Sequence, residues 1–369
     1  MARSAAERMV VQHPIPCLFM RGGTSRGPFF QEADLPLEPT RRDRVLLAVM
    51  GSPDRRQVDG LGGAHPLTSK VGIVRRSQRP GVGVDFLFAQ LQPDMDTVDT
   101  TPNCGNMLAA AAPFALEVGL VRAQDDTTIV RVHTLNTGMQ CDVTVCTPDG
   151  RVSYEGDARI DGVPGTSAPI KISFLETAGS VAPGLLPTSR VRDVVNGLEV
   201  TCIDNGMPLV LVRARDVGRT GYEAVADLNA DGELRARLES LRLACGHAMG
   251  LGDVTAKNYP KMTLVAPPRA GGHIATRSFI PHVCHDAIGV LAAVTVGTAC
   301  VLDGSVARGV ALLPEGTTKT LSVEHPTGEL TVELEVDPGD PQSVLRAALV
   351  RTARLIMRGE VMVPASLFT

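Results

Sequence analysis

A cysteine at the start of an apolar run is the first candidate for chemistry. Cys104 lies in the segment Pro-Asn-Cys-Gly-Asn-Met, residues 102–107, and the run that follows carries one charged residue, Glu117. The run predicts a helix that is apolar on every side and therefore buried, capped by Asn103 and disturbed at Pro113. A helix N-terminus attracts anions and favours a thiolate, so this cysteine suits proton transfer beside an anionic ligand. The alternative is an ordinary buried cysteine.

Lys70 is the second candidate. It follows a glycine-rich loop, residues 59–69, and precedes a short apolar strand at 71–74. A lysine held neutral by burial or by neighbouring cations can take a proton from carbon, whereas a lysine at the surface stays charged. Both interpretations are open on the residues alone.

A third group of residues suits anion binding. Residues 21–28 read Arg-Gly-Gly-Thr-Ser-Arg-Gly-Pro between apolar segments at 15–20 and 29–30, which predicts a hairpin. Glycine lets a backbone approach a ligand closely, while arginine and hydroxyl groups bind carboxylate or phosphate. The spacing fits neither a P-loop nor a dinucleotide-binding loop. A plain surface turn is the alternative.

The pattern of a polar cluster followed by an apolar run recurs late in the chain. His282, Cys284 and His285 precede a run that ends at Leu302 and is too short for a membrane span of about 20 residues. Two buried helices with polar starts predict two similar domains whose helix N-termini meet in a cleft. The histidines lack the spacing of a metal site.

Composition favours an enzyme of two domains. The chain has 369 residues, a net charge of −4, no Trp and eight Cys without metal-finger spacing. These features argue against nucleic acid, membrane and metal partners, and predict reduced thiols in the cytoplasm. The domains are expected at 1–188 with a returning strand at about 360–369, and at 189–359.

The remaining elements follow from periodicity and turn residues. Residues 1–13 are expected to be weakly structured, and Asn-Gly at 205–206 predicts a turn. Strands are expected at 82–91, 128–134, 139–146, 151–154, 170–174, 198–203, 209–212, 261–266, 273–280, 319–323 and 329–336, and helices at 40–50, 225–228, 231–249 and 342–358.

Four motifs in this order resemble a known family. They are residues 20–30, the Gly62–Lys70 loop, Asn103–Asn106 and Asp204–Pro208. The chain resembles the 2-methylaconitate cis-trans isomerase (PrpF-like) family, and within it the 4-oxalomesaconate tautomerases of gallate and protocatechuate breakdown. The resemblance implies an α+β, diaminopimelate epimerase-like fold, in which two pseudo-repeat domains each wrap a curved β-sheet around a central buried helix. It also implies an isomerase that needs no metal or organic cofactor.

The resemblance assigns roles residue by residue. Lys70 is implied as the base, kept neutral with the help of Arg21 and Arg277, and Cys104 as the group that donates or shuttles the proton. Epimerases of this fold use a second cysteine, but His285-Asp286-Ala287 occupies what looks like the equivalent turn here, near Cys284. The polycarboxylate substrate is expected on Arg21, Gly22, Gly23, Thr24, Ser25, Gly62, Gly63, Ser69, Asn103, Gly105, Asn106, Met207, Arg277, His282 and His285.

Several alternatives stay open. The substrate can instead be aconitate or 2-methylaconitate, and the reaction a keto–enol tautomerisation or a 1,3-allylic shift. An amino-acid epimerase that uses Cys284 as a second thiol is a further alternative, as is a non-catalytic protein that binds a dicarboxylate. A homodimer is compatible with the sequence, which does not fix the oligomeric state.

Overall fold

The computed structural model describes residues 12–175, 177–340 and 343–368. The expectation for the first residues therefore lies outside the described part, except that residues 12 and 13 already belong to a strand. The chain divides into two compact units. Unit 1 comprises Met1–Ile172 and Arg351–Thr369, and unit 2 comprises Ser173–Val350. The divisions thus fall at 172/173 and 350/351, earlier in the chain than the expected 188/189 and 359/360.

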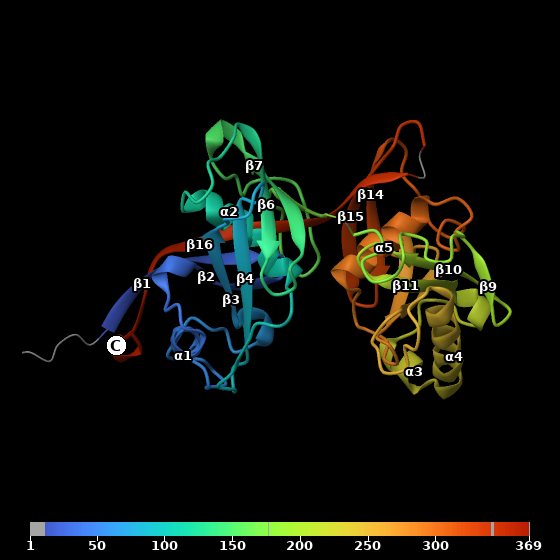
Figure 1. Ribbon diagram of the computed structural model, residues 1–369, viewed down its shortest axis with the longest axis horizontal. Helices are drawn as coiled ribbons and strands as arrows, with labels where there is room; N and C mark the ends of the chain where they lie inside the picture. Colours follow the sequence, from blue (N-terminus) through green and yellow to red (C-terminus); the bar gives the residue numbers. More distant parts are fainter. Residues whose placement is uncertain (1–11, 176, 341–342, 369) are drawn as a thin grey trace, which may run out of the picture. The chain divides into compact units, whose positions relative to one another are not determined.

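Unit 1 is built on a mixed sheet around one buried helix (Figure 1). Neighbouring strands pair antiparallel, parallel, antiparallel, parallel and antiparallel in turn. In spatial order the strands are β1 (Gln12–Gly22), β2 (Ser25–Gln31), β3 (Lys70–Arg76), β4 (Val84–Leu91), β6 (Asp126–Thr134) and β7 (Gln140–Thr147), with β5 (Val98–Asp99) beside β4.

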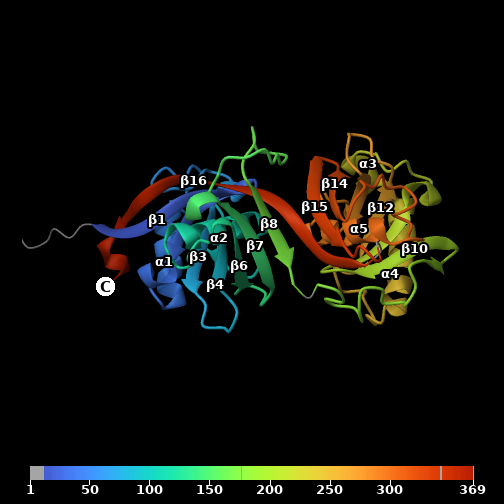
Figure 2. The ribbon, with the colours of Figure 1, turned by 90° about the horizontal axis from the view of Figure 1, so that it is seen from above.

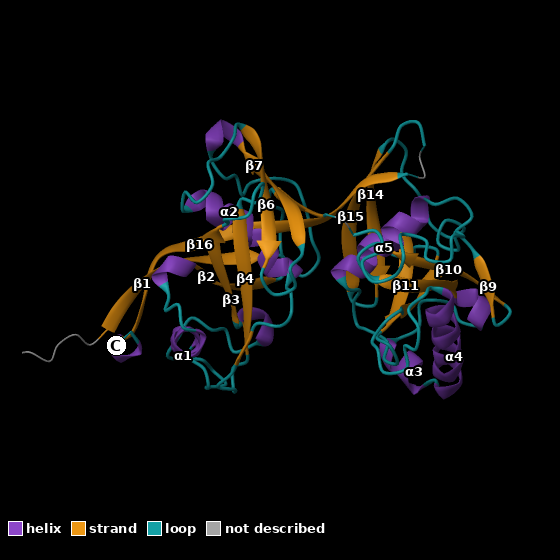
Figure 3. Ribbon diagram, viewed as in Figure 1, coloured by secondary structure: helices purple, strands orange, loops and turns teal. Residues whose placement is uncertain are grey.

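Helix α2 (Gly105–Glu117) is the buried helix of unit 1, and Figure 3 shows it among the strands. Every residue from Met107 to Ala115 is buried, as expected for a helix without a polar side. Phe114 packs against Phe29 of β2, with ring centres 5.7 Å apart. Pro113 lies inside the helix, and the N-cap is Cys104 rather than the expected Asn103, because Cys104 is the last residue with extended backbone angles.

A second helix lies at the edge of the same unit. Helix α1 (Pro39–Met50) begins at Glu38, whose carboxylate accepts hydrogen bonds from the backbone N–H groups of Thr40 and Arg41. It buries Val45, Leu46, Val49 and Met50, the spacing of one helix face.

Unit 2 repeats this topology. Its strands pair in the same alternation, antiparallel, parallel, antiparallel, parallel and antiparallel. They are β10 (Leu198–Asp204), β11 (Pro208–Arg213), β12 (Lys261–Ala266), β13 (Ile274–Phe279), β14 (Thr318–His325) and β15 (Gly328–Val336), with β9 (Asp193–Val195) beside β10; the helices are α3 (Val225–Ala230), α4 (Gly232–Ala248) and the buried α5 (Val290–Val301). The expected pseudo-repeat is therefore present in the pairing order itself.

Strand β16 (Val344–Pro364) corrects one prediction. A helix was expected at 342–358, but residues 344–349 pair with β15 and residues 353–364 pair with β1. Figure 2 shows β16 running alongside β1. The expected return of residues 360–364 to the first domain is confirmed. The strand expected at 151–154 is absent, whereas the one expected at 170–174 is present as β8 (Pro169–Phe174).

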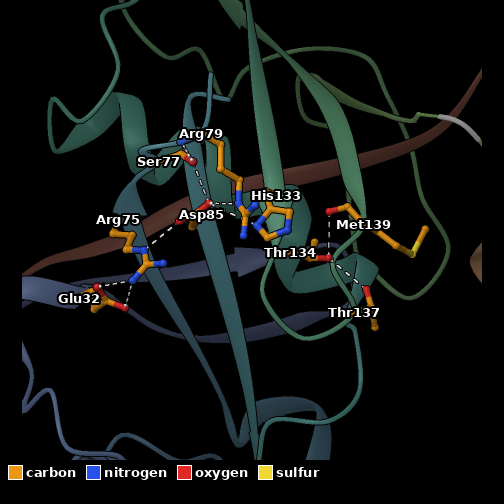
Figure 4. A network of polar contacts seen from close by, with 9 residues as sticks. All are labelled: Glu32, Arg75, Ser77, Arg79, Asp85, His133, Thr134, Thr137 and Met139. Carbon is orange, nitrogen blue, oxygen red and sulfur yellow. Dashed lines mark hydrogen bonds and ion pairs between the residues drawn. The ribbon is translucent and has the colours of Figure 1, made fainter. Parts of the chain in front are cut away.

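A buried carboxylate ties three strands of unit 1 together (Figure 4). Asp85 of β4 is 3% exposed and accepts hydrogen bonds from Arg75 Nε at 2.9 Å and from Ser77 Oγ at 2.9 Å. His133 Nδ1 of β6 lies 3.3 Å from Asp85 Oδ1, and Arg75 also contacts Glu32. The network fixes β4 between its neighbours in the sheet that carries the site described next.

Candidate active site

Lys70 is a buried lysine with a polar and an aromatic neighbour. It is the first residue of β3, is 7% exposed, and donates a hydrogen bond from Nζ to Gln90 Oε1 of β4. Nζ also lies 4.9 Å from the centre of the Phe88 ring. Burial lowers the pKa of Lys70 below its ordinary value, and the nearby Cys104 opposes part of that shift. The position therefore favours a neutral amine, the form that acts as a base.

Gln90 is held so that its carbonyl oxygen faces the lysine. Its Nε2 donates to the backbone oxygens of Pro66 at 3.0 Å and Leu91 at 2.8 Å. The amide is thereby oriented, and Oε1 is left to accept from Lys70.

Cys104 stands at the N-terminus of α2. It is half-buried, its carbonyl accepts the N–H of Leu108 at 2.9 Å, and its side chain makes no capping hydrogen bond. Cys104 interacts electrostatically with Lys70, so the two groups share one environment. A thiol at the positive end of a helix, near a lysine, can exchange a proton with a ligand that both groups contact.

The glycines of the arginine-rich turn bring it onto the first turn of α2. A Cβ added at Gly22 would lie 2.2 Å from Asn106 O, and one at Gly23 would lie 2.1 Å from Asn106 Oδ1. Asn106 Nδ2 in turn donates to Thr24 Oγ1 at 2.9 Å. The two glycines therefore allow the backbone of the turn to approach the helix. This contact places the turn beside Cys104.

Ser25 of this turn has a buried side-chain hydroxyl. It is 1% exposed, and its Oγ has no hydrogen-bond partner among the residues that the structure describes. A buried hydroxyl normally has a partner, so an unpaired one beside a helix N-terminus indicates a ligand.

Arg21 lies on the face of the sheet that points away from α2. Arg21 and Gly22 are successive residues of β1, so their side chains point to opposite faces of the sheet, and the Gly22 side faces α2. Arg21 Nη1 donates to Gly23 O at 2.9 Å and Thr352 Oγ1 at 2.9 Å, and Nη2 to Ser167 Oγ at 3.4 Å. These hydrogen bonds tie Arg21 to the turn after β1, to β16 and to the segment before β8, and its role in substrate binding stays a prediction.

The loop before Lys70 is folded around a buried glutamine. Ser69 Oγ donates to Gln57 Oε1 at 2.8 Å, and a Cβ at Gly62 would lie 2.2 Å from the Gln57 side chain. A Cβ at Gly63 would lie 2.4 Å from Thr68 Oγ1. These residues determine the conformation of the loop that precedes Lys70. The Ser69 hydroxyl is hydrogen-bonded within that loop.

Asn103 and Gly105 flank the cysteine. Asn103 is exposed and donates from Nδ2 to Thr137 Oγ1 at 2.5 Å. Gly105 is the first residue of α2, where its backbone N–H has no partner within the helix and faces outward from its end.

Arg277 lies on the side of the unit 2 sheet that packs against α4. Arg277 is opposite Leu264, a member of the core cluster that includes α4 residues, and donates from Nε to Glu223 O at 2.9 Å and from Nη1 to Thr276 O at 2.9 Å. Burial lowers the pKa of Arg277, and Cys284 in the same cluster opposes the shift.

The two histidines are exposed. His282 Nδ1 lies 3.4 Å from Glu239 Oε2 of α4, and His285 Nδ1 accepts the N–H of Ala287 at 2.8 Å. Their contacts are with α4 and with the local turn, and neither residue begins the buried helix.

The N-cap of α5 in unit 2 is the position that corresponds to Cys104 at the N-cap of α2 in unit 1. The N-cap of α5 is Gly289, several residues beyond the turn at 285–287 that was expected to match. Lys261 begins β12 as Lys70 begins β3, and a Cβ on Gly289 would lie 3.9 Å from Lys261 Nζ. Unit 2 therefore keeps a lysine at the equivalent place but has no thiol at the helix N-cap. Met207 is held beside the helix, since Thr295 Oγ1 donates to its carbonyl at 3.2 Å.

Arg351 is a residue of the site region that the sequence did not indicate. It lies on β16 in unit 1, is partly exposed, and interacts electrostatically with Cys104. Because a helix was expected at 342–358, the sequence did not indicate which of its arginines face the site. A strand prediction at 351–354 would have placed Arg351 and Arg354 on opposite faces of the sheet.

The described residues show neither a metal cluster nor a membrane-spanning helix. No group of three or more His, Cys, Asp or Glu side chains in the described ranges is arranged to hold a metal ion. Within the same ranges, none of the helices combines the length and apolarity that a membrane crossing requires.

Comparison with known proteins decides the family. A family model described as "PrpF protein" matches residues 12–364. The (4E)-oxalomesaconate Delta-isomerase of Novosphingobium sp. (strain KA1) is 58% identical, over 94% of this chain and 97% of that protein. The 4-oxalomesaconate tautomerase of Pseudomonas putida is 55% identical, over 95% of this chain and 96% of that protein. This chain belongs to the PrpF protein family.

Membership of the PrpF family agrees with the fold and sets the class of reaction. A crystal structure of a methylitaconate-delta-isomerase matches with a TM-score of 0.85 and 35% identity, over 97% of each chain. The expected α+β fold, with a buried helix in each of two repeated units, is confirmed. The named PrpF relatives are isomerases, and this PrpF protein is an isomerase too.

Proposed function

We propose that this PrpF protein isomerises 4-oxalomesaconate by moving a proton along an allylic system, with Lys70 as the base and Cys104 as the proton donor. The observation that carries the proposal is the buried Lys70, whose pKa burial lowers, in electrostatic contact with a cysteine at a helix N-terminus. The names of two relatives more than half identical to this chain supply the substrate.

The reaction needs one proton removed and one returned. The neutral amine of Lys70 takes a proton from the carbon next to the conjugated carbonyl system, and the bond electrons spread into an extended enolate. The Cys104 thiol gives its proton to the far end of the allylic system, which shifts the double bond. Transfer of the proton from the ammonium to the thiolate resets both groups, so no atom is gained or lost. The same pair can catalyse keto–enol tautomerisation.

The negative charge of the intermediate is matched by fixed positive charge. The N-terminus of α2, with the free N–H groups of Gly105 and Asn106, faces the site region where Cys104 lies. Donors fixed before the reaction stabilise an enolate without reorganisation. Ser25 adds a buried hydroxyl without a partner in the described chain.

The setting of the reaction is part of the proposal. Degradation of gallate is the pathway that the sequence resemblance implies, and the cytoplasm is the compartment expected for reduced thiols. All eight cysteines are free in the structure, which supports a reducing compartment.

An NMR assay in D₂O tests the proposal. The purified protein is given 4-oxalomesaconate, 2-methylaconitate, aconitate or 3-methylitaconate, and isomer ratios and deuterium incorporation are followed with and without EDTA. Fast turnover of 4-oxalomesaconate that survives EDTA is the expected result. Preference for 2-methylaconitate or aconitate would replace the substrate, and binding without any deuterium exchange would indicate a binding protein. Proline, supplied in the same way, would be inverted only by an epimerase.

A further inference from the structure

Strand register places Arg351 on the α2 face of the unit 1 sheet. Ala353 is opposite Gly22, and Gly22 is opposite Ser25. Residues opposite one another on antiparallel strands share a face, and every second residue of a strand does too. Arg351, Ala353, Gly22 and Ser25 therefore point to one side. That side meets α2, because a Cβ at Gly22 would lie 3.2 Å from Ala110 Cβ.

Arg351 also lies at the correct end of α2. The neighbouring residue Thr352 accepts the N–H of Gly23 through its carbonyl at 2.8 Å. Gly23 packs on Asn106 in the first turn of the helix, one residue after the pair Cys104–Gly105. The start of β16 in unit 1 is thus attached to the turn that rests on the N-terminus of α2.

The electrostatics of Arg351 agree with this placement. Burial lowers the pKa of Arg351 to about 10, and Cys104 is the group that opposes the shift. The guanidinium remains charged at neutral pH, so it is a partly buried cation that interacts electrostatically with the thiol. A planar guanidinium with several N–H donors matches a carboxylate better than any other side chain does.

Lys70 and Ser25 share this face with Arg351. Ser25, Gly27 and Phe29 alternate along β2, and Phe29 packs on Phe114 of α2. A Cβ at Gly27 would lie 1.8 Å from Lys70 O, so β2 and β3 are in close contact at the lysine. The base, the thiol, the unpaired Ser25 hydroxyl and Arg351 therefore gather at one end of one sheet face.

From this geometry we propose that Arg351, together with Ser25, binds one substrate carboxylate beside the carbon that Cys104 protonates. The inference rests on the proposed function, because it takes a polycarboxylate as the substrate. Arg351 lies on the α2 face of the unit 1 sheet, whereas Arg21 lies on the opposite face. Its charge holds the carboxylate in place and stabilises the enolate that forms next to it.

Steady-state kinetics of matched arginine variants test the inference. Arg351→Met and Arg351→Lys are compared with Arg354→Met, which removes the same charge from the exposed opposite face of the same strand. Arg351→Met is expected to raise KM for 4-oxalomesaconate by about 10- to 100-fold, the effect of losing charge-assisted hydrogen bonds. Arg351→Lys should recover only part of the loss. Arg354→Met should keep the wild-type KM. An unchanged KM in folded Arg351→Met would overturn the inference.

Ligand trimming separates a binding role from a structural one. Propane-1,2,3-tricarboxylate and glutarate, which lacks the third carboxylate, are titrated calorimetrically into wild-type protein and Arg351→Met. The variant should lose affinity for the tricarboxylate and lose little for glutarate. Equal losses for both ligands would mean that Arg351 does not bind the carboxylate by which they differ. If Arg351→Met does not fold, the same comparison with Arg351→Lys decides the question.

A double-mutant cycle with Ser25→Ala tests whether both residues hold one carboxylate. The cost of Ser25→Ala in KM should be smaller in the Arg351→Met background than in wild type. Full additivity would contradict a shared carboxylate. Failure of the proposed function and failure of this inference give different results. If the substrate is another polycarboxylate, the Arg351 variants should still show a raised KM for it. If only the inference fails, the wild-type protein still turns over 4-oxalomesaconate.

Discussion

Lys70 and Gln90 face each other across β3 and β4, and the lysine donates its hydrogen bond to the glutamine oxygen. The acceptor is neutral. Burial lowers the pKa of this lysine and outweighs the opposing effect of Cys104. A carboxylate at the same place would hold the ammonium charged and prevent it from acting as a base.

Gln90→Glu is therefore expected to raise the pKa of Lys70. An opposite charge at this range shifts a pKa by about 1–3 units, and the base must be neutral. The rising limb of kcat/KM against pH should then move to higher pH, with at least a roughly tenfold loss at pH 7 for each unit. Gln31→Glu, at the far end of β2, makes the same charge change as a control. An unshifted limb would remove Lys70 as the titrating base.

Lys70→Met should abolish proton removal. We expect turnover to fall by roughly 10²–10⁴-fold, the usual contribution of general acid–base catalysis, and deuterium to stop entering the substrate. Methionine keeps the length and apolar volume of the side chain, so circular dichroism should be unchanged. Near-normal exchange in this variant would show that another group is the base.

Cys104→Ser should separate the two proton transfers. A hydroxyl is a far weaker acid than a thiol, so protonation of the enolate should slow while proton removal by Lys70 continues. The NMR assay in D₂O should then show exchange into the starting isomer with little net isomerisation. Equal loss of exchange and of product would place the cysteine in the first step instead.

Asp85→Asn tests the network of Figure 4. Burial acts to raise the pKa of Asp85, but hydrogen bonds from Arg75 and Ser77 outweigh it, so the pKa is lowered. A lowered pKa stabilises the fold above the unfolded value of about 3.9, and this stabilisation is lost as pH falls through the folded pKa. The variant should lose about 1–3 kcal/mol at pH 7.

Urea denaturation at several pH values measures this loss. The difference between wild type and Asp85→Asn should shrink in acid, while kcat per folded molecule stays the same. Asp94→Asn at an exposed ion pair is the control and should cost less than about 0.5 kcal/mol. A deficit that is constant down to acid pH would mean that the charge of Asp85 does not matter.

Much of the fold could be predicted because its elements carry local signals. Helix α2 has no polar side, and the turns of β1–β2 and β10–β11 contain the glycines that such turns require. Residues 344–358 were wrongly predicted to be helical because Leu, Ala and Arg favour a helix locally. Pairing with β15 and with β1 decides the structure there, and neither partner is near in sequence.

The candidate site was predictable only in part for a related reason. Lys70 and Cys104 could be predicted from sequence motifs. Which face of the sheet an arginine side chain occupies depends on whether its position in the strand is odd or even. Arg277 lies in a strand whose residues are all buried, so no alternation in the sequence indicates its side. Arg21 and Arg351 differ by which face of the sheet they occupy, and that depends on the long-range register of β1 and β16.

The glycine at position 289 has a stereochemical consequence. A racemase removes a proton from one face of a carbon and returns one to the other, which takes an acid–base group on each side. Here the thiol position of unit 2 holds Gly289, while Lys70 and Cys104 belong to the same unit. Hydrogen should therefore leave and arrive on a single face of the planar enolate, a suprafacial migration. A substrate stereospecifically labelled with deuterium would report it, and delivery to the opposite face would refute it. On this arrangement the reaction moves hydrogen along the carbon skeleton and does not invert a stereocentre.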